Sequence, residues 1–199
     1  MERLLQERGK CLTALVPGQR GLAILPPRRI STPIDKWRRA YDPLFAFVPP
    51  HITVAYPPFV PEEDWPAVQS ELARCLSSFS PFRIRLRGLG TFSGETFVLW
   101  LRPEDDGTLV RMHARLAEEF PQYVPALPFD YVPHLTIGCF EAEDELQRAQ
   151  QTVEAEMVAR QFLVRELIYT SPDQGGAWRA CQRLALGASP DRAKAEGVR

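Results

Sequence analysis

The sequence has little net charge and no long apolar run, and each shortage excludes a class of protein. With 24 Lys and Arg against 25 Asp and Glu, the 199 residues carry a formal net charge of −1. A general polyanion-binding role is therefore excluded, and any contact with nucleic acid must come from a local patch. No apolar run approaches the roughly 20 residues that span a bilayer, so no membrane association is expected.

Cysteines are also few, and none is close to another. The four lie far apart, without a CxxC pair, at Cys11, Cys75, Cys139 and Cys181. A disulfide framework or a zinc cluster is therefore not expected. Scattered single cysteines are typical of a reducing compartment, so we expect a cytoplasmic protein.

Length and composition favour one domain of two closely packed lobes. Apolar residues make up 45% and charged residues 25%, as in ordinary globular proteins. We expect this domain over residues 21–186. Residues 1–20 carry scattered charges and no apolar block before a small-residue cleavage site, which predicts an N-terminal extension. The polar tail 187–199 is predicted to be disordered.

Hydrophobic periodicity predicts strands alternating with helices through the domain. The predicted strands are residues 21–25, 51–56, 82–89, 96–101, 134–140, 161–170 and 178–186. The predicted helices are residues 31–43, 61–79, 106–120 and 143–157. In the first helix, Ser31 or Thr32 can cap and Pro33 suits the first turn.

One short motif occurs twice and uses two of the three histidines. "VPPHITVAYP" begins at Val48 and "VPHLTIGCF" begins at Val132, so that His134 lies 83 positions after His51. A single His-x-Thr means little, because most histidines on strands are structural. Nine threonines in the chain make two such matches among three histidines an event on the order of 1% by chance.

The elements around the two motifs also repeat. Strand, helix, motif strand, helix and strand follow one another from about residue 21 to 87 and again from about 96 to 170. A duplicated unit explains this order and predicts two similar lobes about a pseudo-twofold axis. Such an axis would make the two motif strands face each other across one cleft.

The motif suits acid–base chemistry on a phosphate. On a strand, His51 and Thr53 share one face while their neighbours are buried, and His134 and Thr136 do the same. Histidine, with a reference pKa near ~6.5, can act as acid or base. Threonine hydroxyls can bind the non-bridging oxygens. This chemistry needs no metal or other cofactor, and two histidines without a third ligand fall short of a zinc site.

The two motifs resemble those of the 2H phosphoesterase superfamily, which is named for two HxTx motifs. "PHITV" and "PHLTI" match the pattern, and residues 21–59 look like the N-terminal half of the bacterial 2′-5′ RNA ligase-like branch. The resemblance implies a bilobal α+β fold in which two antiparallel sheets face each other across a central cleft, with helices on the outer faces. It also implies the activity of a cyclic phosphodiesterase or 2′-5′ RNA ligase. It also implies that His51 is the general acid and His134 the general base in hydrolysis, with Thr53 and Thr136 binding the phosphate.

Further residues could contact the substrate. Alternating arginines could face the cleft and steer phosphates, or face water from an edge strand; they are Arg83, Arg85 and Arg87. Three aromatic residues could stack on a base or fill the core: Tyr56, Phe92 and Trp100. The hydroxyls of Tyr131 and Tyr169 could reach the phosphate. A basic stretch at Arg28, Arg29, Lys36, Arg38 and Arg39 favours a solvated helix face.

The third histidine, His113, has no threonine two residues later and is expected to be structural, so its substitution should leave activity unchanged. The hypothesis is a metal-independent phosphodiesterase acting on a 2′,3′-cyclic phosphate or 2′-5′ linkage of RNA or a nucleotide. The alternative is a non-catalytic module that binds RNA ends in the same cleft. The expected partners are RNA termini or small nucleotides, and no obligate protein partner is expected.

Overall fold

The computed structural model describes residues 20–125 and 130–187, which form two four-stranded sheets and four helices. In chain order the elements are β1 (Gly21–Ile24), α2 (Arg28–Tyr41), β2 (Ile52–Ala55), α3 (Trp65–Ser77), β3 (Phe82–Ser93), β4 (Phe97–Glu104), α4 (Thr108–Glu119), β5 (Leu135–Phe140), α5 (Glu143–Glu156), β6 (Arg160–Val164), β7 (Glu166–Pro172) and β8 (Trp178–Ala185). The predicted extension and tail lie mostly on residues 1–19 and 188–199, outside the described residues.

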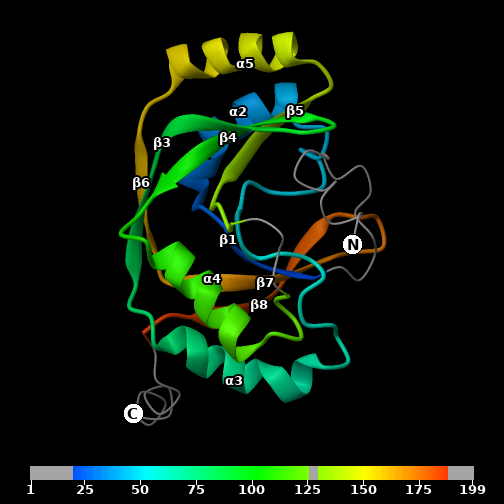
Figure 1. The fold of residues 1–199 in the computed structure, drawn as a ribbon, viewed down its shortest axis with the longest axis vertical. Coiled ribbons are helices and arrows are strands. Elements are labelled where there is room, and N and C mark those ends of the chain that lie inside the picture. The colour runs from blue at the N-terminus through cyan, green and yellow to red at the C-terminus, as the bar shows by residue number, and fades with distance from the viewer. Residues whose placement is uncertain (1–19, 126–129, 188–199) are drawn as a thin grey trace.

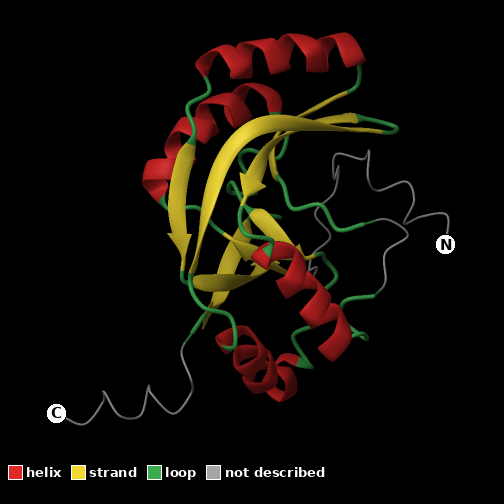
Figure 2. Ribbon diagram, turned by 60° about the vertical axis from the view of Figure 1, so that its left-hand side comes forward, coloured by secondary structure: helices red, strands yellow, loops and turns green. Residues whose placement is uncertain are grey.

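The strands lie between two pairs of helices (Figure 2). The first sheet has the order β2-β1-β7-β8 and the second has the order β5-β4-β3-β6, and every pairing is antiparallel. α3 and α4 pack against the first sheet, and α2 and α5 pack against the second (Figure 1). This architecture confirms the predicted α+β class with helices outside two sheets.

The two sheets exchange strands between the halves of the chain. β3 follows the first motif unit but pairs with β4 of the second, and β7 follows the second unit but pairs with β1 of the first. Each motif strand, β2 or β5, lies at the edge of its sheet beside an equivalent partner, β1 or β4. The predicted repeat is therefore present in the element order, and the exchange binds the two halves together.

One core runs through both halves. Its fully buried members include Leu22 of β1, Leu72 of α3, Leu99 of β4 and Met112 of α4. α2 and α5 are also joined directly, because Glu156 accepts hydrogen bonds from the Lys36 ammonium and the Trp37 indole. None of the helices in the described residues is long and apolar enough to cross a membrane.

Two predicted elements differ from those observed. The sequence predicts one strand over residues 161–170, but β6 pairs with β3 and β7 pairs with β1, with the break at Arg165. The apolar alternation continues across this break, so periodicity cannot show that the chain changes sheet. α2 begins three residues before the expected cap Ser31, because the Pro27 carbonyl accepts the first helical hydrogen bonds. Pro33 consequently lies in the second turn.

Candidate active site

The first motif places its histidine just before an edge strand. His51 is the residue before β2, and its own surface is partly exposed. Ile52 and Val54 are fully buried and anchor the strand in the core. Thr53 belongs to the opposite face of the strand, yet it is only 8% exposed. It is therefore more enclosed than a residue that lines an open cleft.

The second motif repeats this arrangement in the other sheet. His134 is the residue before β5, which is an edge strand like β2. Leu135 and Ile137 are fully buried, whereas His134 and Thr136 are half-buried. The alternation expected from the sequence is therefore visible in the burial of the second motif, whereas all four residues of β2 are buried.

Both imidazoles are oriented by the same local hydrogen bond. His51 Nδ1 lies 3.0 Å from the Pro49 carbonyl oxygen, and His134 Nδ1 lies 2.8 Å from the Val132 carbonyl oxygen. A carbonyl oxygen can only accept, so each Nδ1 carries the hydrogen and donates. In a neutral ring, Nε2 is then the basic nitrogen, and in a charged ring it is the proton donor.

An aromatic side chain lies against each imidazole. The ring of Trp178 in β8 is 4.7 Å from that of His51, and the ring of Phe92 in β3 meets the His134 ring edge-on at 5.0 Å. Trp100 of β4 is 5.1 Å from Phe92 and 6.1 Å from His134. Two equivalent hairpins, β3–β4 and β7–β8, therefore each deliver an aromatic residue to a histidine.

The two motifs contact each other through Tyr131. Its hydroxyl donates to the backbone carbonyl of Thr53 at 2.7 Å, and it lies only three residues before His134. Burial raises the pKa of Tyr131 well above its usual value, so the hydroxyl keeps its proton. The hydroxyl expected to reach the phosphate therefore binds the other motif's backbone.

The surroundings of His51 favour its neutral form. Burial lowers the pKa of His51 to about 4. The hydrogen bond to the Pro49 carbonyl has the opposite effect and raises this pKa, because it favours the charged ring. The positive charges of Arg38 and His134 lower the pKa of His51 as well, so the two imidazoles interact electrostatically. The assignment of the general-acid role to His51 and the general-base role to His134 stays a prediction.

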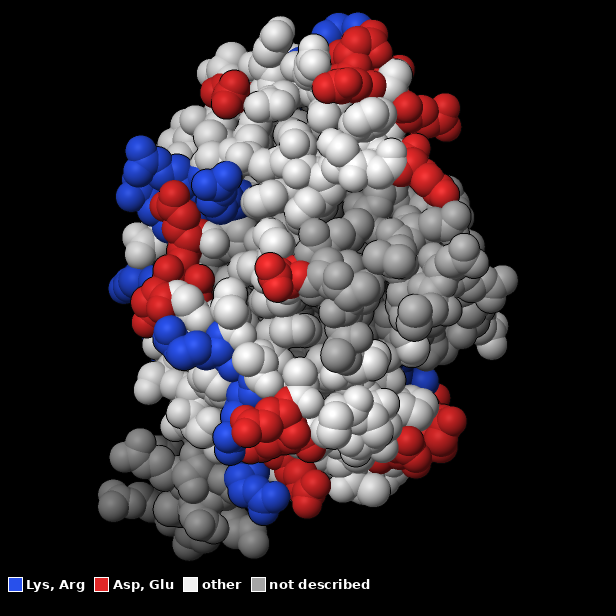
Figure 3. Space-filling view, in the orientation of Figure 1, with Lys and Arg blue, Asp and Glu red and all other residues white. Residues whose placement is uncertain are grey.

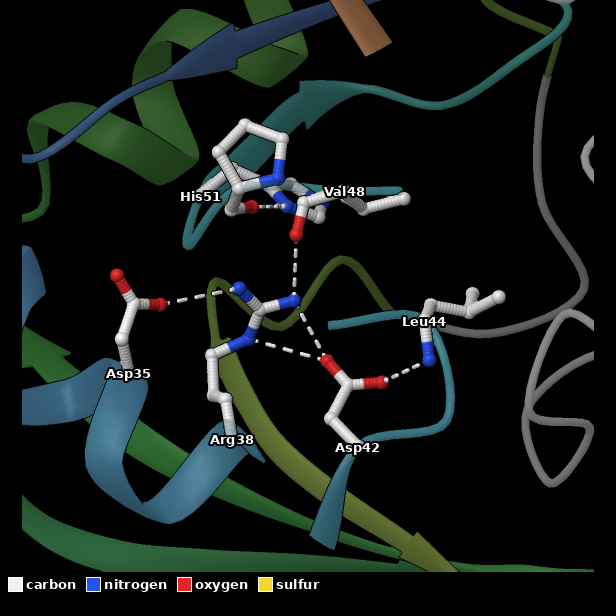
Figure 4. A network of polar contacts seen from close by, with 7 residues as sticks. Asp35, Arg38, Asp42, Leu44, Val48 and His51 are labelled. Carbon is white, nitrogen blue, oxygen red and sulfur yellow. Dashed lines mark hydrogen bonds and ion pairs between the residues drawn. The ribbon is translucent and has the colours of Figure 1, made fainter. Parts of the chain in front are cut away.

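Arg38 is a site neighbour that sequence reasoning missed. It is 2% exposed, which contradicts the expected solvated face for this member of the basic stretch. Its Nε and Nη2 donate to one carboxylate oxygen of Asp42 at 3.0 and 2.6 Å, and Nη2 also donates to the Val48 carbonyl at 2.7 Å (Figure 4). The i, i+4 spacing of Arg38 and Asp42 could have indicated their ion pair, whereas nothing in the sequence indicates the contact with Val48.

A family model described as the 2′-5′ RNA ligase superfamily matches residues 26–176, a range that includes both motifs. The chain belongs to this superfamily. As a superfamily member it is similar to "Putative phosphoesterase GK0864" of Geobacillus kaustophilus, with 33% identity over 118 residues, 59% of this chain and 67% of that protein. "Putative phosphoesterase BLi01284/BL02661" of Bacillus licheniformis is 22% identical over 172 residues, 84% of this chain and 98% of the other.

Solved structures share the fold of this superfamily member. The protein TT0787 of Thermus thermophilus superposes with a TM-score of 0.61 at 20% sequence identity, covering 86% of this chain and 99% of the other. Apo LigT of Escherichia coli gives a TM-score of 0.61 at 21% identity with the same coverage. LigT has also been solved in complex with 3′-AMP and with phosphate.

In this superfamily member, the three alternating arginines are exposed on an inner strand. β3 pairs with β4 and β6, so the edge-strand alternative for Arg83, Arg85 and Arg87 is wrong. Within residues 20–125 and 130–187, no hydrogen bond or ion pair joins them to either motif, and their role in steering phosphates stays a prediction. On the face in Figure 3, basic and acidic side chains are mixed.

The remaining aromatic candidates separate into two groups. Tyr169 is 3% exposed, stacks on Trp65 at 3.7 Å and donates its hydroxyl to the Val60 carbonyl, so it is a core residue that does not reach the motifs. Tyr56 lies at the end of the first motif, with its ring 6.2 Å from that of Tyr131. Phe92 contacts His134 directly, and its stacking on a base stays a prediction.

His113 is half-buried, but it is not remote from the motifs. Its Nδ1 is 2.8 Å from the Val54 carbonyl oxygen of β2, and its ring stacks on Tyr131 at 4.1 Å. The structural role expected for His113 agrees with these contacts. Since it supports the first motif strand, however, it is unsuitable as an inert control.

Proposed function

We propose that the protein is a metal-independent phosphodiesterase that opens 2′,3′-cyclic phosphates or cleaves 2′-5′ linkages of RNA or nucleotide derivatives. His51 and His134 are the acid–base pair, and the hydroxyls of Thr53 and Thr136 bind the non-bridging phosphate oxygens. Membership of a phosphoesterase superfamily supports the reaction class. The LigT complexes with 3′-AMP and phosphate support a nucleotide substrate.

The matched orientation of the two imidazoles is the observation that carries this proposal. Each Nδ1 is bound to a carbonyl two residues earlier, which leaves proton transfer to Nε2 in both rings. The two rings interact electrostatically, and Tyr131 ties the motif segments together. Such a pair can accept one proton and donate another at a single phosphorus centre.

The chemical step needs only these two groups and water. One neutral imidazole removes a proton from water as the water oxygen attacks phosphorus. The bond from phosphorus to one ribose oxygen breaks, and the other imidazole, in its protonated form, gives its proton to that oxygen. The product is a phosphomonoester. With a ribose hydroxyl in place of water as the nucleophile, the same steps would join a cyclic phosphate end to that hydroxyl without ATP.

The test is turnover of a 2′,3′-cyclic nucleotide in the presence of EDTA. We expect wild type to open the ring and His51→Ala and His134→Ala each to lose at least about 100-fold in kcat/KM, as loss of an acid–base group does. Glu154→Ala is the control, because this residue is exposed on α5 and makes no contact with the motifs.

Two results would contradict the proposal. Retained turnover in both histidine variants would show that His51 and His134 are not the acid–base pair. A wild type that binds 3′-AMP but turns over neither cyclic nucleotides nor 2′-5′ linked RNA would instead support a non-catalytic module that binds RNA ends.

A further inference from the structure

A β-bulge in the β3–β4 hairpin places two arginines side by side. At this point β3 has two residues between its neighbouring pairs with β4, whereas β4 has one. The two residues of β3 are Arg87 and Gly88, and the one of β4 is Arg102. Gly88 has a φ of 73°, a left-handed conformation that glycine adopts without strain and that is typical of bulges.

Both arginines point to the exposed face of the sheet. The adjacent pair, Leu86 of β3 and Pro103 of β4, is buried and belongs to the other face. Because side chains alternate along a strand, Arg87 and Arg102 point away from that buried face, and both are exposed.

The arginine pair lies beside the second motif. β4 and β5 are antiparallel, and Leu101 pairs with Leu135. The next residue of β4 is Arg102 and the residue before Leu135 is His134, so the register brings these two opposite each other. Both lie near the ring of Trp100: its centroid is 6.0 Å from the Arg102 guanidinium carbon and 6.1 Å from the centroid of the His134 ring.

No carboxylate in the described parts of the chain neutralises the pair. Within residues 20–125 and 130–187, neither Arg87 nor Arg102 makes a hydrogen bond or an ion pair, and Glu104, which lies opposite Arg85, is joined to neither of them. Other exposed arginines are ion-paired: Arg111, Arg115, Arg148, Arg179 and Arg183. Like charges at opposed positions destabilise a sheet, so folding alone does not explain this pair.

A phosphate is the ligand that two adjacent guanidiniums fit. Each guanidinium presents a planar fork of N–H donors that matches the oxygens of a phosphate. Neighbouring strands are about 4.8 Å apart, and Arg102 and Arg87 lie one and two strands away from His134. This separation is comparable to that of the two phosphates on either side of one ribose.

We propose that Arg87 and Arg102 form a second phosphate subsite, which binds the 5′-phosphate of the nucleotide whose 3′ end lies at the two motifs. In an RNA strand, this group is the diester to the preceding nucleotide. In a free nucleotide, it is the terminal 5′-phosphate. The placement of the 3′ end at the motifs rests on the proposed function.

Calorimetric binding of two nucleotides tests the subsite without turnover. Adenosine 3′,5′-bisphosphate carries the second phosphate, and 3′-AMP lacks it. We expect wild type to bind the bisphosphate about tenfold more tightly, because hydrogen bonds between charged groups are strong. Arg87→Gln and Arg102→Gln should each lose most of this preference and keep the wild-type affinity for 3′-AMP.

Arg148→Gln is the matched control. It removes the same charge from an exposed residue of α5 that is ion-paired with Asp144, so the preference should be retained. Thermal unfolding separates binding from folding: Arg87→Gln should not lower the melting temperature, because it removes one of two like charges.

Gly88→Ala tests the bulge with both arginines in place. A Cβ on Gly88 would meet no atom within 4 Å, so the substitution acts through the backbone alone. Since alanine is strained at a φ of 73°, the bulge should change shape and the preference for the bisphosphate should fall.

Turnover of three cyclic substrates identifies the source of the second phosphate. They are adenosine 2′,3′-cyclic phosphate with a free 5′-hydroxyl, the same nucleotide with a 5′-phosphate, and an adenosine dinucleotide that ends in a 2′,3′-cyclic phosphate. We expect kcat/KM to be about tenfold higher for the last two, and Arg87→Gln to remove the difference. A preference for the dinucleotide alone would assign the subsite to an RNA strand, and a preference for the 5′-phosphorylated mononucleotide alone would assign it to a free nucleotide.

Three results would overturn the inference. The first is equal affinity of wild type for 3′-AMP and the bisphosphate. The second is a wild-type preference in both Arg87→Gln and Arg102→Gln. The third is an equal loss of affinity for both ligands in these variants, which would place the arginines at the reacting phosphate. A wild type that prefers the bisphosphate through these arginines but opens no cyclic phosphate would contradict the proposed function and leave the subsite standing.

Discussion

At the scale of single residues, the two motif histidines have the same orientation but different surroundings. Both donate Nδ1–H to a carbonyl two residues earlier, but the ring of His51 contacts Trp178 whereas the ring of His134 contacts Phe92. Two carboxyl groups in unlike environments take opposite acid–base roles in well-known glycosidases. The same principle predicts that the two imidazoles divide the roles of acid and base.

Tyr131 provides the first residue-scale prediction, because its hydroxyl joins the two motifs. Tyr131→Phe removes the hydrogen bond to the Thr53 carbonyl. We expect kcat to fall about tenfold, since small displacements of catalytic groups are costly. Stability should fall by only about 0.5–1.5 kcal/mol, the net value of one hydrogen bond. Steady-state kinetics and urea unfolding measure the two effects.

Tyr123→Phe is the matched control for this change. The Tyr123 hydroxyl donates to Asp64 at 3.0 Å, and this bond joins the region after α4 to the start of α3. The Tyr123→Phe substitution should lower stability by a similar amount and leave kcat unchanged. Equal losses of kcat in both variants would show that Tyr131 acts through stability alone.

Local pattern was enough to predict the four motif residues, but not their neighbours. The i, i+2 phase of His51 and Thr53 follows from the strand itself. The burial of Arg38 depends on the Val48 carbonyl, which no side-chain pattern reports. Trp178 could have been found, because adding the 83-residue repeat to Phe92 gives 175, three residues from it.

At the scale of elements, the β3–β4 hairpin holds the aromatic residues around His134 through close packing at Gly90. A Cβ on Gly90 would lie 2.2 Å from Cζ2 of the Trp100 indole, so the ring lies directly on the glycine. Trp100 in turn contacts Phe92 and His134. The absence of a side chain at position 90 therefore sets where this hairpin places its rings.

Gly90→Ala is expected to displace the indole and lower both stability and activity. Overpacking of this kind costs about 1–3 kcal/mol, and kcat should fall because the ring beside His134 moves. Thr91→Ala is the control, since Thr91 is exposed on the same strand. Thermal unfolding and kinetics of both variants check the prediction. A Gly90→Ala protein with the wild-type melting temperature and kcat would refute the packing argument.

Most elements were predictable from hydrophobic period, and the exceptions have physical causes. α3, α4 and α5 keep their apolar faces at helical spacing, with Leu72, Leu116 and Val153 buried as expected. The β6–β7 break was not predictable, because both strands are apolar and only their pairing partners differ. Which sheet a strand joins is decided by tertiary contacts between segments far apart in sequence.

At the scale of the whole molecule, strand exchange makes each half of the chain depend on the other. β3 completes the sheet of the second motif, and β7 completes the sheet of the first. One core continues through both sheets. Neither half can bury its sheet alone, so the paired-histidine site forms only when both halves fold.

This interdependence predicts a single cooperative unfolding transition. Leu22→Ala in the first sheet and Leu99→Ala in the second each remove a fully buried side chain and should cost about 2–5 kcal/mol. Both variants should shift the whole transition, with coincident midpoints by circular dichroism and tryptophan fluorescence. Val110→Ala, at a residue that is 48% exposed, should leave the midpoint nearly unchanged. A transition that splits in two in either leucine variant would mean that the lobes unfold independently and that exchanged strands do not couple them.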